Sequence, residues 1–516
     1  MEENRDNYLI QLASTIRTNW DQPALTDFYL SEDGTAQDTS RGNHYTYGEM
    51  YVEICRVAEL LTSLGLQKGD HIAICGANSA HWVIAYLAIA KMQGVSVTVM
   101  HTLMPDQIAS LVDFSDAKAL FTDEDIWGEL ASSNRSYMGG LSSVISLSDW
   151  SLLEGRSDRA MTERRPRDNR DISFPKSAPD DLAMICFTSG TSGMPKGVML
   201  SNKNVNNNVA QSYSLNPICS ERKYLALLHP AHMSGLIDVV AHLAVGKYLH
   251  VFKCSLSVDN IIYAYKLLSP YMIISIPQLI MLCVKRRGFV ESLRGCKLIF
   301  LGGAKLSKEE EKEIIQLGIP LSIIYGQTET GASISISPYK QHRLGSCGKI
   351  VSGMTARISP VGEILVKGEN VMLGYYKDPE ATAQKIDSDG WLHTGDKGHL
   401  DEDGYLYVEG RLEQDIIVLP NGENIRPDNI ESLINALPEV SESLVLARDG
   451  KLVAIVVPDS QMSNHKSQIT NTDLRRKILR AINPSLPLYS QLYDIEITDQ
   501  PLARTEKQTL KRYLYN

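Results

Sequence analysis

One segment of the chain concentrates groups that suit a polyphosphate; it reads Phe-Thr-Ser-Gly-Thr-Ser-Gly-Met-Pro-Lys-Gly-Val over residues 187–198. The candidate phosphate contacts are hydroxyls, glycine backbone and one ammonium group, on Thr188, Ser189, Gly190, Thr191, Ser192, Gly193 and Lys196. Hydroxyl donors, exposed N–H groups and a cation on a loop without bulky side chains favour a polyphosphate. The mononucleotide P-loop is excluded, because Gly-Lys-Ser/Thr never occurs at the required spacing. We therefore expect a different way of holding ATP; a flexible surface turn is the alternative for such a loop taken alone.

Alternating apolar strands and amphipathic helices are expected to position this loop. The loop directly follows the apolar run 182–187. Upstream, the pattern predicts a helix that ends near Leu64, a strand at 71–76, a helix at 82–92 and a strand at 95–99. Strand, helix and strand at this spacing predict a parallel α/β layer. The same rhythm returns in the apolar runs 272–276 and 298–301.

Length and composition limit the classes to which the protein can belong. With 516 residues, the chain is expected to form two or more domains, since one hydrophobic core rarely supports so many. A hydrophobic content of 43% and a charged content of 22% are ordinary for a globular enzyme. The net charge of -10 argues against nucleic acid or an anionic membrane as the main partner.

The cysteines and the apolar windows indicate the compartment. Eight scattered cysteines include no Cys-x-x-Cys pair, which predicts reduced core residues in a cytoplasmic protein. The polar N-terminus lacks the apolar stretch of a signal peptide. The longest apolar windows, such as 272–284, are too short to span a bilayer. We expect a soluble, cytoplasmic protein, with polar surface loops at 155–180 and 459–472.

Five motifs, in the same order and at comparable spacing, resemble those of the adenylate-forming superfamily. It includes acyl- and aryl-CoA ligases, adenylation domains of peptide synthetases and firefly luciferase. Besides the loop at 187–197, the motifs are Tyr-Gly-Gln-Thr-Glu at 325–329, Gly-Trp-Leu-His-Thr-Gly-Asp at 390–396, Asp-Gly-Tyr-Leu at 403–406 leading to Gly410 and Arg411, and Asn-Gly-Glu-Asn-Ile at 421–425. The resemblance covers about residues 45–512 and is closest in type to acid–CoA ligases.

This resemblance implies an α/β fold with two domains. A large N-terminal portion of several subdomains, residues 1–410, would contain mixed and parallel sheets with helices and would bind ATP and the acid. A small α+β domain, residues 411–516, would be mobile and would rotate between two half-reactions. The pivot position of the family aligns with Glu413.

Adenylation joins a carboxylate to the α-phosphate of ATP and expels pyrophosphate. Because two anions must meet in line, the site needs charge neutralisation and positioning more than an acid or a base. The resemblance implies that Thr328 and Glu329 meet the α-phosphate and Mg²⁺, with Glu329 as the metal ligand. One carboxylate together with phosphate oxygens is a common way of holding Mg²⁺.

Further motif residues would bind the nucleoside. By the resemblance, Tyr325, followed by Gly326, lays its ring on adenine. Asp396 would accept hydrogen bonds from the ribose hydroxyls, with Arg411 assisting. Taken alone, a Tyr-Gly pair after a strand is usually a turn, and an aspartate in a Gly-Asp turn is often a capping residue.

The acid is expected beside Gly303 and Ala304, because glycine after a strand lets the backbone approach a ligand closely. His232 matches a family position at the acid pocket and on the path of the thiol, although a histidine in an apolar segment is often structural. The next residue, Met233, stands where amino-acid-activating relatives carry an aspartate for the substrate ammonium. A thioether cannot pair with an ammonium group, which favours an aliphatic or aryl acid over an α-amino acid.

The C-terminal motif departs from the family pattern. The family pattern Thr-x-x-Gly-Lys-Ile-x-Arg aligns with Thr-Glu-Lys-Gln-Thr-Leu-Lys-Arg at 505–512, which puts Thr509 where the lysine belongs. Lys507 and Lys511 lie two residues away, on the same face of an extended segment. Three outcomes stay open: either lysine replaces the missing one, adenylation is slow while thiol transfer is intact, or the protein is a degenerate binder of acyl-adenylates.

The motifs together favour an ATP- and Mg²⁺-dependent acid–thiol ligase. The acid would be activated as acyl-AMP and then transferred to a thiol, with coenzyme A preferred. The alternative acceptor is the phosphopantetheine arm of a separate carrier protein. A non-catalytic sensor of nucleotide or acyl-adenylate is the rival from another class, and it rests on Thr509.

Overall fold

The computed structural model describes residues 7–31, 36–133, 139–154, 172–188, 195–214, 223–286, 288–304, 306–412, 417–419, 423–425, 427–459, 470–502 and 515. The chain forms two compact units. The first contains residues 1–188 and 196–409, and the second contains residues 189–195 and 410–516. Every residue of the candidate site described below lies in the first unit.

An eight-stranded sheet forms the first layer of this unit, with the order β19-β9-β8-β4-β3-β5-β6-β7. The strands are β3 (His71–Cys75), β4 (Val95–Thr98), β5 (Ala119–Thr122), β6 (Ser143–Ser146), β7 (Leu152–Glu154), β8 (Leu182–Thr188), β9 (Lys196–Ser201) and β19 (Gly374–Tyr375). The five strands from β8 to β6 in this order are parallel, whereas β7, β9 and β19 pair antiparallel. The parallel layer predicted from strands near 71–76 and 95–99 is confirmed.

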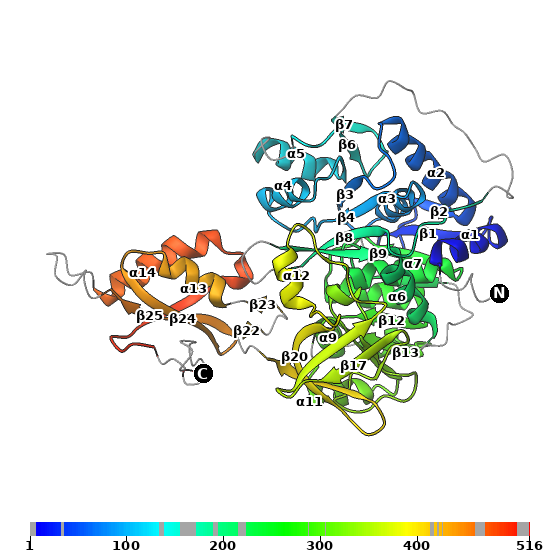
Figure 1. Ribbon diagram of the computed structural model, residues 1–516. Coiled ribbons are helices and arrows are strands. Elements are labelled where there is room, and N and C mark those ends of the chain that lie inside the picture. The colour runs from blue at the N-terminus through cyan, green and yellow to red at the C-terminus, as the bar shows by residue number, and fades with distance from the viewer. Residues whose placement is uncertain are drawn as a thin grey trace. The chain divides into compact units, whose positions relative to one another are not determined.

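Helices cover both faces of this sheet. Figure 1 shows α2 (Tyr47–Ser63) and α3 (Ala80–Lys91) on one face, and α4 (Pro105–Phe114) and α5 (Glu124–Ser133) on the other. Helix α2 begins at a capping box, in which Thr46 and Glu49 each accept from the other's backbone N–H. Ten of the twelve residues of α3 are buried, because the helix lies between the sheet and α2.

A second sheet carries the ends of two strands that matter for the site. It has the order β12-β13-β14-β15-β16, with β12 (Met272–Ser275), β13 (Leu298–Leu301), β14 (Leu321–Tyr325), β15 (Ser335–Ile336) and β16 (Lys349–Ile350). Strands β12, β13 and β14 are parallel, and α8 (Val258–Leu268), α9 (Pro277–Val284), α10 (Phe289–Ser292) and α11 (Lys308–Ile315) belong to this region. Since parallel strands end at one edge of a sheet, the segments after β13 and β14 emerge side by side.

Two four-stranded sheets and four more α-helices are described in this unit. One sheet has the order β10-β11-β1-β2, with β10 (Lys223–Ala226), β11 (Tyr248–Phe252), β1 (Pro23–Phe28) and β2 (His44–Thr46). The other has the order β17-β18-β20-β21, with β17 (Met354–Ile358), β18 (Glu363–Gly368), β20 (Leu392–Leu400) and β21 (Leu406–Arg411). The helices are α1 (Tyr8–Thr18), α6 (Asn202–Ser214), α7 (Met233–Ala244) and α12 (Pro379–Lys385).

The second unit has its own sheets and core. Strands β24 (Val440–Arg448), β25 (Lys451–Pro458) and β26 (Leu492–Ile497) form one sheet, and β22 (Ile417–Val418) pairs with β23 (Asn424–Ile425). Helices α13 (Pro427–Asn435) and α14 (Asn471–Ile482) pack on the larger sheet through Ile434, Leu474 and Ile478. In neither unit is a described helix long and apolar enough to cross a membrane. The seven described cysteines are free.

Candidate active site

The segment Tyr325–Glu329, at the end of β14, meets the motif that ends at Asp396 in β20. The Tyr325 hydroxyl donates a hydrogen bond to Oδ2 of Asp396 over 2.6 Å. The Gln327 side-chain amide donates to the same oxygen over 2.9 Å and to the carbonyl oxygen of Thr394 over 2.8 Å. Asp396 is only 6% exposed, so these donors offset the cost of burying its carboxylate. Two motifs about 70 residues apart in sequence are thereby joined.

The other end of the same segment meets the start of β9. Glu329 lies in the 3-10 turn Thr328–Thr330, and its Oε1 accepts a hydrogen bond from the Tyr375 hydroxyl over 2.7 Å. Burial and the nearby Glu329 carboxylate raise the pKa of Tyr375, so this hydroxyl keeps its proton. Nζ of Lys196 lies 4.9 Å from the centre of the Tyr375 ring, a cation–π distance. Lys196, Tyr375 and Glu329 therefore form a row of cation, ring and carboxylate.

Glycine is required where these strands end. A Cβ atom on Gly326 would lie 1.8 Å from the carbonyl oxygen of Ala332, and one on Gly302 would lie 2.2 Å from Cγ2 of Ile324. Both contacts are far shorter than atoms tolerate, so neither position accepts a side chain. Gly303 has a φ of +83°, in the left-handed region that glycine adopts without strain. The two strand ends can therefore pack closely beside a cavity.

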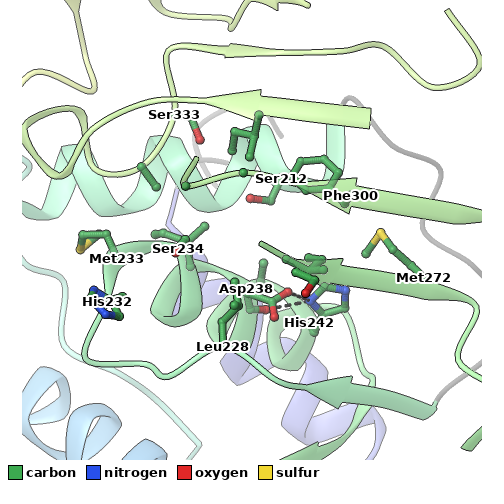
Figure 2. A pocket seen from close by; sticks show the side chains of 18 of the residues that line it. Ser212, Leu228, His232, Met233, Ser234, Asp238, His242, Met272, Phe300 and Ser333 are labelled. Carbon is green, nitrogen blue, oxygen red and sulfur yellow. Dashed lines mark hydrogen bonds and ion pairs between the residues drawn. The ribbon is translucent and has the colours of Figure 1, made fainter. Parts of the chain in front are cut away.

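That cavity has a volume of about 460 Å³ and lies among α7, β12, β13 and β14. Gly302, Gly303, Gly326 and Thr328 line it on the side of the strand ends. Helix α7 contributes one stripe of residues at helical spacing, namely Met233, Ser234, Ile237, Asp238, Ala241 and His242. Figure 2 shows this stripe running along the cavity, from His232 and Met233 at one end to Asp238 and His242 further along. Ile274, Phe300 and Ile324 add apolar surface to the walls, and Ser212, Ser275 and Ser333 add hydroxyl groups.

Two histidines lie at the His232 end of the cavity and differ in their surroundings. His229 accepts from the Ala231 N–H at Nδ1 over 3.0 Å, while its Nε2 lies 3.1 Å from the Gly76 carbonyl oxygen. Burial and the stacked ring of His101 lower the pKa of His229 to about 3, so its imidazole is neutral. Both ring nitrogens are then engaged in hydrogen bonds. His232 precedes α7 and is accessible from the cavity, although the surrounding protein lowers its pKa. Both histidines line the cavity, and His232 is the more exposed of the two.

Glu329 fits a Mg²⁺ ion that also contacts phosphate. The Tyr375 hydroxyl donates to Oε1 of Glu329, and no residue that the structure describes donates to Oε2. Among the described residues, no three His, Cys, Asp or Glu side chains form a group that could hold a metal. A single carboxylate suits Mg²⁺, which commonly takes its remaining ligands from water and substrate phosphates.

The structure describes ten of the predicted site residues: Thr188, Lys196, His232, Gly303, Ala304, Tyr325, Gly326, Thr328, Glu329 and Asp396. Thr188 ends β8 opposite Lys196 in β9, and Ala304 follows Gly303 without lining the cavity. The other predicted residues lie outside the described part of the chain, namely Ser189, Gly190, Thr191, Ser192, Gly193, Lys507, Lys511, the pivot Glu413 and the side chain of Arg411. Their roles stay predictions.

Several residues of the site had no signal in the sequence. Tyr375 links Lys196 to Glu329 from β19, about 46 residues after the glutamate. Gln327 occupies the variable position of its motif, yet it binds Asp396. Ser275, at the end of β12, is 1% exposed, and its hydroxyl has no hydrogen-bond partner among the described residues. Ser275 lines the cavity, so a ligand could meet this hydroxyl.

Comparison with named relatives points to acid–CoA ligases. The chain is 27% identical over 486 residues to 4-coumarate–CoA ligase 4 of Arabidopsis thaliana, which covers 86% of this chain and 82% of the relative. It is 29% identical over 426 residues to 2-succinylbenzoate–CoA ligase of Oceanobacillus iheyensis, which covers 80% of this chain and 83% of the relative. The fold matches the o-succinylbenzoate CoA synthetase of Bacillus subtilis, with a TM-score of 0.74, 24% identity, and coverage of 98% of this chain and 97% of that one.

Family models match both parts of the chain. The model described as AMP-binding enzyme matches residues 13–376, and that described as AMP-binding enzyme C-terminal domain matches residues 414–515. The first match alone spans more than half of the chain and contains the segment Tyr325–Glu329, Lys196 and Tyr375. The chain therefore belongs to the AMP-binding enzyme family, within the adenylate-forming superfamily that its motifs resemble.

Proposed function

We propose that this protein is an AMP-forming acid–CoA ligase. The observation that carries the proposal is the double connection of the segment Tyr325–Glu329, which is bound to Asp396 at one end and to Tyr375 at the other, beside a cavity for the acid. A nucleoside group at Asp396 and a phosphate group at Glu329 would then be held by one short turn. The named relatives are CoA ligases, which supports the choice of reaction.

In the first half-reaction, a carboxylate oxygen of the acid attacks the α-phosphorus of ATP. The bond to the β-phosphate oxygen breaks, so acyl-AMP forms and pyrophosphate leaves. Lys196 and Thr328 would bind phosphate oxygens, and Asp396 would accept from the ribose hydroxyls. Mg²⁺ bound at Glu329 would neutralise phosphate charge. Positioning of this kind supplies most of the catalysis that phosphoryl chemistry needs.

In the second half-reaction, the thiol sulfur of coenzyme A attacks the acyl carbonyl carbon. The bond from that carbon to the AMP oxygen breaks, AMP leaves, and the thiol proton passes to solvent. His232, accessible from the cavity, would lie on the path of the thiol. The unit from Gly410 onward would be the mobile domain of the family, and Lys507 or Lys511 would supply the cation absent at Thr509.

Acid-dependent exchange of labelled pyrophosphate into ATP tests this function. We expect exchange with at least one aliphatic or aryl acid, and none with α-amino acids, because Met233 stands directly after His232, where an aspartate would pair with the substrate ammonium. Thioester formation with free coenzyme A should then follow. Exchange without transfer to coenzyme A, but with transfer to a carrier protein, would identify the carrier-loading alternative. Complete absence of exchange with a broad panel of acids would favour the acyl-adenylate binder.

A further inference from the structure

Helix α6 (Asn202–Ser214) is rich in a residue that forms helices poorly. Five of its thirteen residues are asparagine, in the run Asn-Lys-Asn-Val-Asn-Asn-Asn at 202–208. Asparagine is unfavourable inside a helix, because its side chain competes for backbone hydrogen bonds. Each of these five amides makes a hydrogen bond with another segment of the chain. The composition of α6 is therefore explained by tertiary contacts rather than by helix stability.

One of these amides, that of Asn208, binds the backbone that directly follows Glu329. The side chain of Asn208 is fully buried. Its Nδ2 donates a hydrogen bond to the carbonyl oxygen of Thr330 over 3.3 Å, and its Oδ1 accepts from the Ser333 N–H over 3.1 Å. The contact is close, because a Cβ atom on Gly331 would lie 2.5 Å from Nδ2 of Asn208. A single planar amide thus bridges two backbone groups of this segment.

A second buried amide, that of Asn370, binds the carbonyl oxygen of Ser333. Nδ2 of Asn370 donates to this oxygen over 2.8 Å and to Oε1 of Gln211 over 2.9 Å. Its Oδ1 accepts from Nδ2 of Asn207 over 2.8 Å and from Nε2 of Gln211 over 3.3 Å. Both donors and both acceptor positions of the amide are used, so its orientation is fixed. Because the other two side chains belong to α6, the helix holds Ser333 through Asn370 as well as directly.

Asn204 connects α6 to a further segment that contacts Glu329. Its Nδ2 donates to the carbonyl oxygens of Glu369 over 2.6 Å and of Val371 over 3.0 Å. The next residue, Met372, donates its N–H to the backbone carbonyl oxygen of Glu329 over 2.9 Å. The backbone of Glu329 is therefore held through this segment, and that of the residues after it by the two buried amides.

We propose that Asn208 and Asn370 are positioning residues for Mg²⁺ binding. By fixing the backbone around the turn Thr328–Thr330, they would hold the Glu329 carboxylate where it meets the metal ion together with phosphate oxygens. This inference rests on the proposed function, which places Mg²⁺ at Glu329. Neither amide would touch the metal ion or the nucleotide, so both would act through the turn.

The chemistry of these side chains favours positioning over stability. The hydrogen bonds of a buried amide largely offset the cost of removing it from water, so a well-packed apolar side chain could stabilise the fold as well. A fully satisfied polar network, in contrast, specifies one backbone geometry. A binding site needs such a geometry, because its groups must be held within about 0.5 Å of their working positions.

The test measures how much Mg²⁺ tightens nucleotide binding, which requires no catalysis. Calorimetry with α,β-methylene-ATP, in which the bond that breaks is blocked, gives the Kd without and with Mg²⁺. In Asn208→Leu, which keeps the branched shape but loses the donor and the acceptor, we expect the ratio of these two values to fall about tenfold or more, because loss of a group that orients a metal ligand costs about 10- to 100-fold in affinity. Asn370→Leu should behave in the same way. Without Mg²⁺ the Kd should change less than about threefold, since the donors to Asp396 are untouched.

The matched control is Asn206→Leu. Asn206 lies on the same helix, but its Oδ1 accepts from the Tyr8 N–H at the start of α1, over 3.1 Å. This variant also loses a tertiary hydrogen bond, so its Tm should fall, while the ratio of the Kd values should equal that of the wild type. The pair Asn208→Ala and Asn206→Ala repeats the comparison with smaller side chains if leucine at position 208 prevents folding beside Gly331.

Three results would overturn the inference. The first is a ratio that is the same in the wild type and in the variants of Asn208 and Asn370. The second is a ratio that falls equally in the Asn206 variants, because the loss would then reflect general destabilisation. In both cases the ligase function stands, since the wild-type chain binds the nucleotide and uses Mg²⁺. The third is a wild-type chain that binds no nucleotide with or without Mg²⁺, which would refute the proposed function and this inference together.

Discussion

The hydroxyl of Tyr375 donates a hydrogen bond to Oε1 of Glu329 over 2.7 Å, which fixes the carboxylate that we propose as the Mg²⁺ ligand. Tyr375 also carries the ammonium group of Lys196 over its ring. A single aromatic residue from β19 thus sets the relative position of an anion and a cation that come from β14 and β9. The proposed site for the nucleotide and Mg²⁺ would depend on this contact.

Replacing Tyr375 by phenylalanine should therefore weaken adenylation. The variant keeps the ring beneath Lys196 but removes the hydrogen bond to Glu329, so we expect pyrophosphate exchange to fall by about 10- to 100-fold, which corresponds to about 1.5–3 kcal/mol for a hydrogen bond to a charged group. Raising the Mg²⁺ concentration should restore part of the rate. The matched control is Tyr376→Phe, whose hydroxyl binds the exposed Asp116 instead; a similar loss in the control would contradict the role of Tyr375.

Replacing Asp396 by asparagine should weaken ATP binding without unfolding the protein. Asparagine keeps the volume of the side chain but has only one acceptor oxygen, so it cannot both accept from Tyr325 and Gln327 and offer a second oxygen to the ribose. We expect the Kd for ATP, measured by calorimetry, to rise at least about tenfold, with a smaller change in Tm. Asp403→Asn, on the exposed partner of Arg343, is the control. An unchanged Kd in Asp396→Asn would show that the nucleotide does not bind at Asp396.

Replacing Gly326 by alanine should destabilise the protein. The added Cβ would lie 1.8 Å from the Ala332 carbonyl oxygen, and overpacking against backbone typically costs about 1–3 kcal/mol or more. Urea unfolding monitored by circular dichroism measures the loss. Gly128→Ala, in helix α5 with open space around the new atom, should be neutral or stabilising by up to about 1 kcal/mol. Equal stability of the two variants would show that the backbone after β14 moves to accommodate the added Cβ atom without loss of stability.

Stability should fall as the pH decreases from about 6.5 towards 3. His250 is 2% exposed with neither ring nitrogen hydrogen-bonded to a described residue, and burial lowers its pKa to about 3. In this window the unfolded chain binds a proton that the folded protein does not, so each such histidine removes about 1.4 kcal/mol per pH unit. Denaturant titrations across this pH range should show a shallower slope in His250→Leu. A slope identical to that of the wild type would mean that His250 is protonated in the folded protein.

The idea that Lys507 or Lys511 replaces the family lysine absent at Thr509 can be tested separately. Lys507→Ala or Lys511→Ala should abolish pyrophosphate exchange while sparing thioester formation from added acyl-AMP, because only the first half-reaction brings two anions together. The double variant covers the case in which either lysine can serve. Normal exchange in both single variants and in the double variant would mean that neither residue replaces the missing lysine.

Sequence periodicity was sufficient for much of the fold. The strands at 71–76 and 298–301 and the helix to Leu64 correspond to β3 (His71–Cys75), β13 (Leu298–Leu301) and α2 (Tyr47–Ser63). Such runs are predictable because burial of one face or of both faces dictates a local apolar pattern. The starts of helices were less predictable, since α3 begins at Ala80, where Ser79 accepts a hydrogen bond from the Trp82 N–H, two residues before the apolar pattern indicates.

By itself, the sequence determined the family and the reaction class, because motifs such as Tyr325–Glu329 and 390–396 carry their chemistry in residue type and local spacing. Only the tertiary structure decided which side chains complete the site. Tyr375 reaches Glu329, and Asn208 reaches Thr330, through pairing and packing between segments that are distant in the chain. No local pattern encodes such contacts, because a tyrosine at a strand end looks the same whether it faces a carboxylate, a core or solvent.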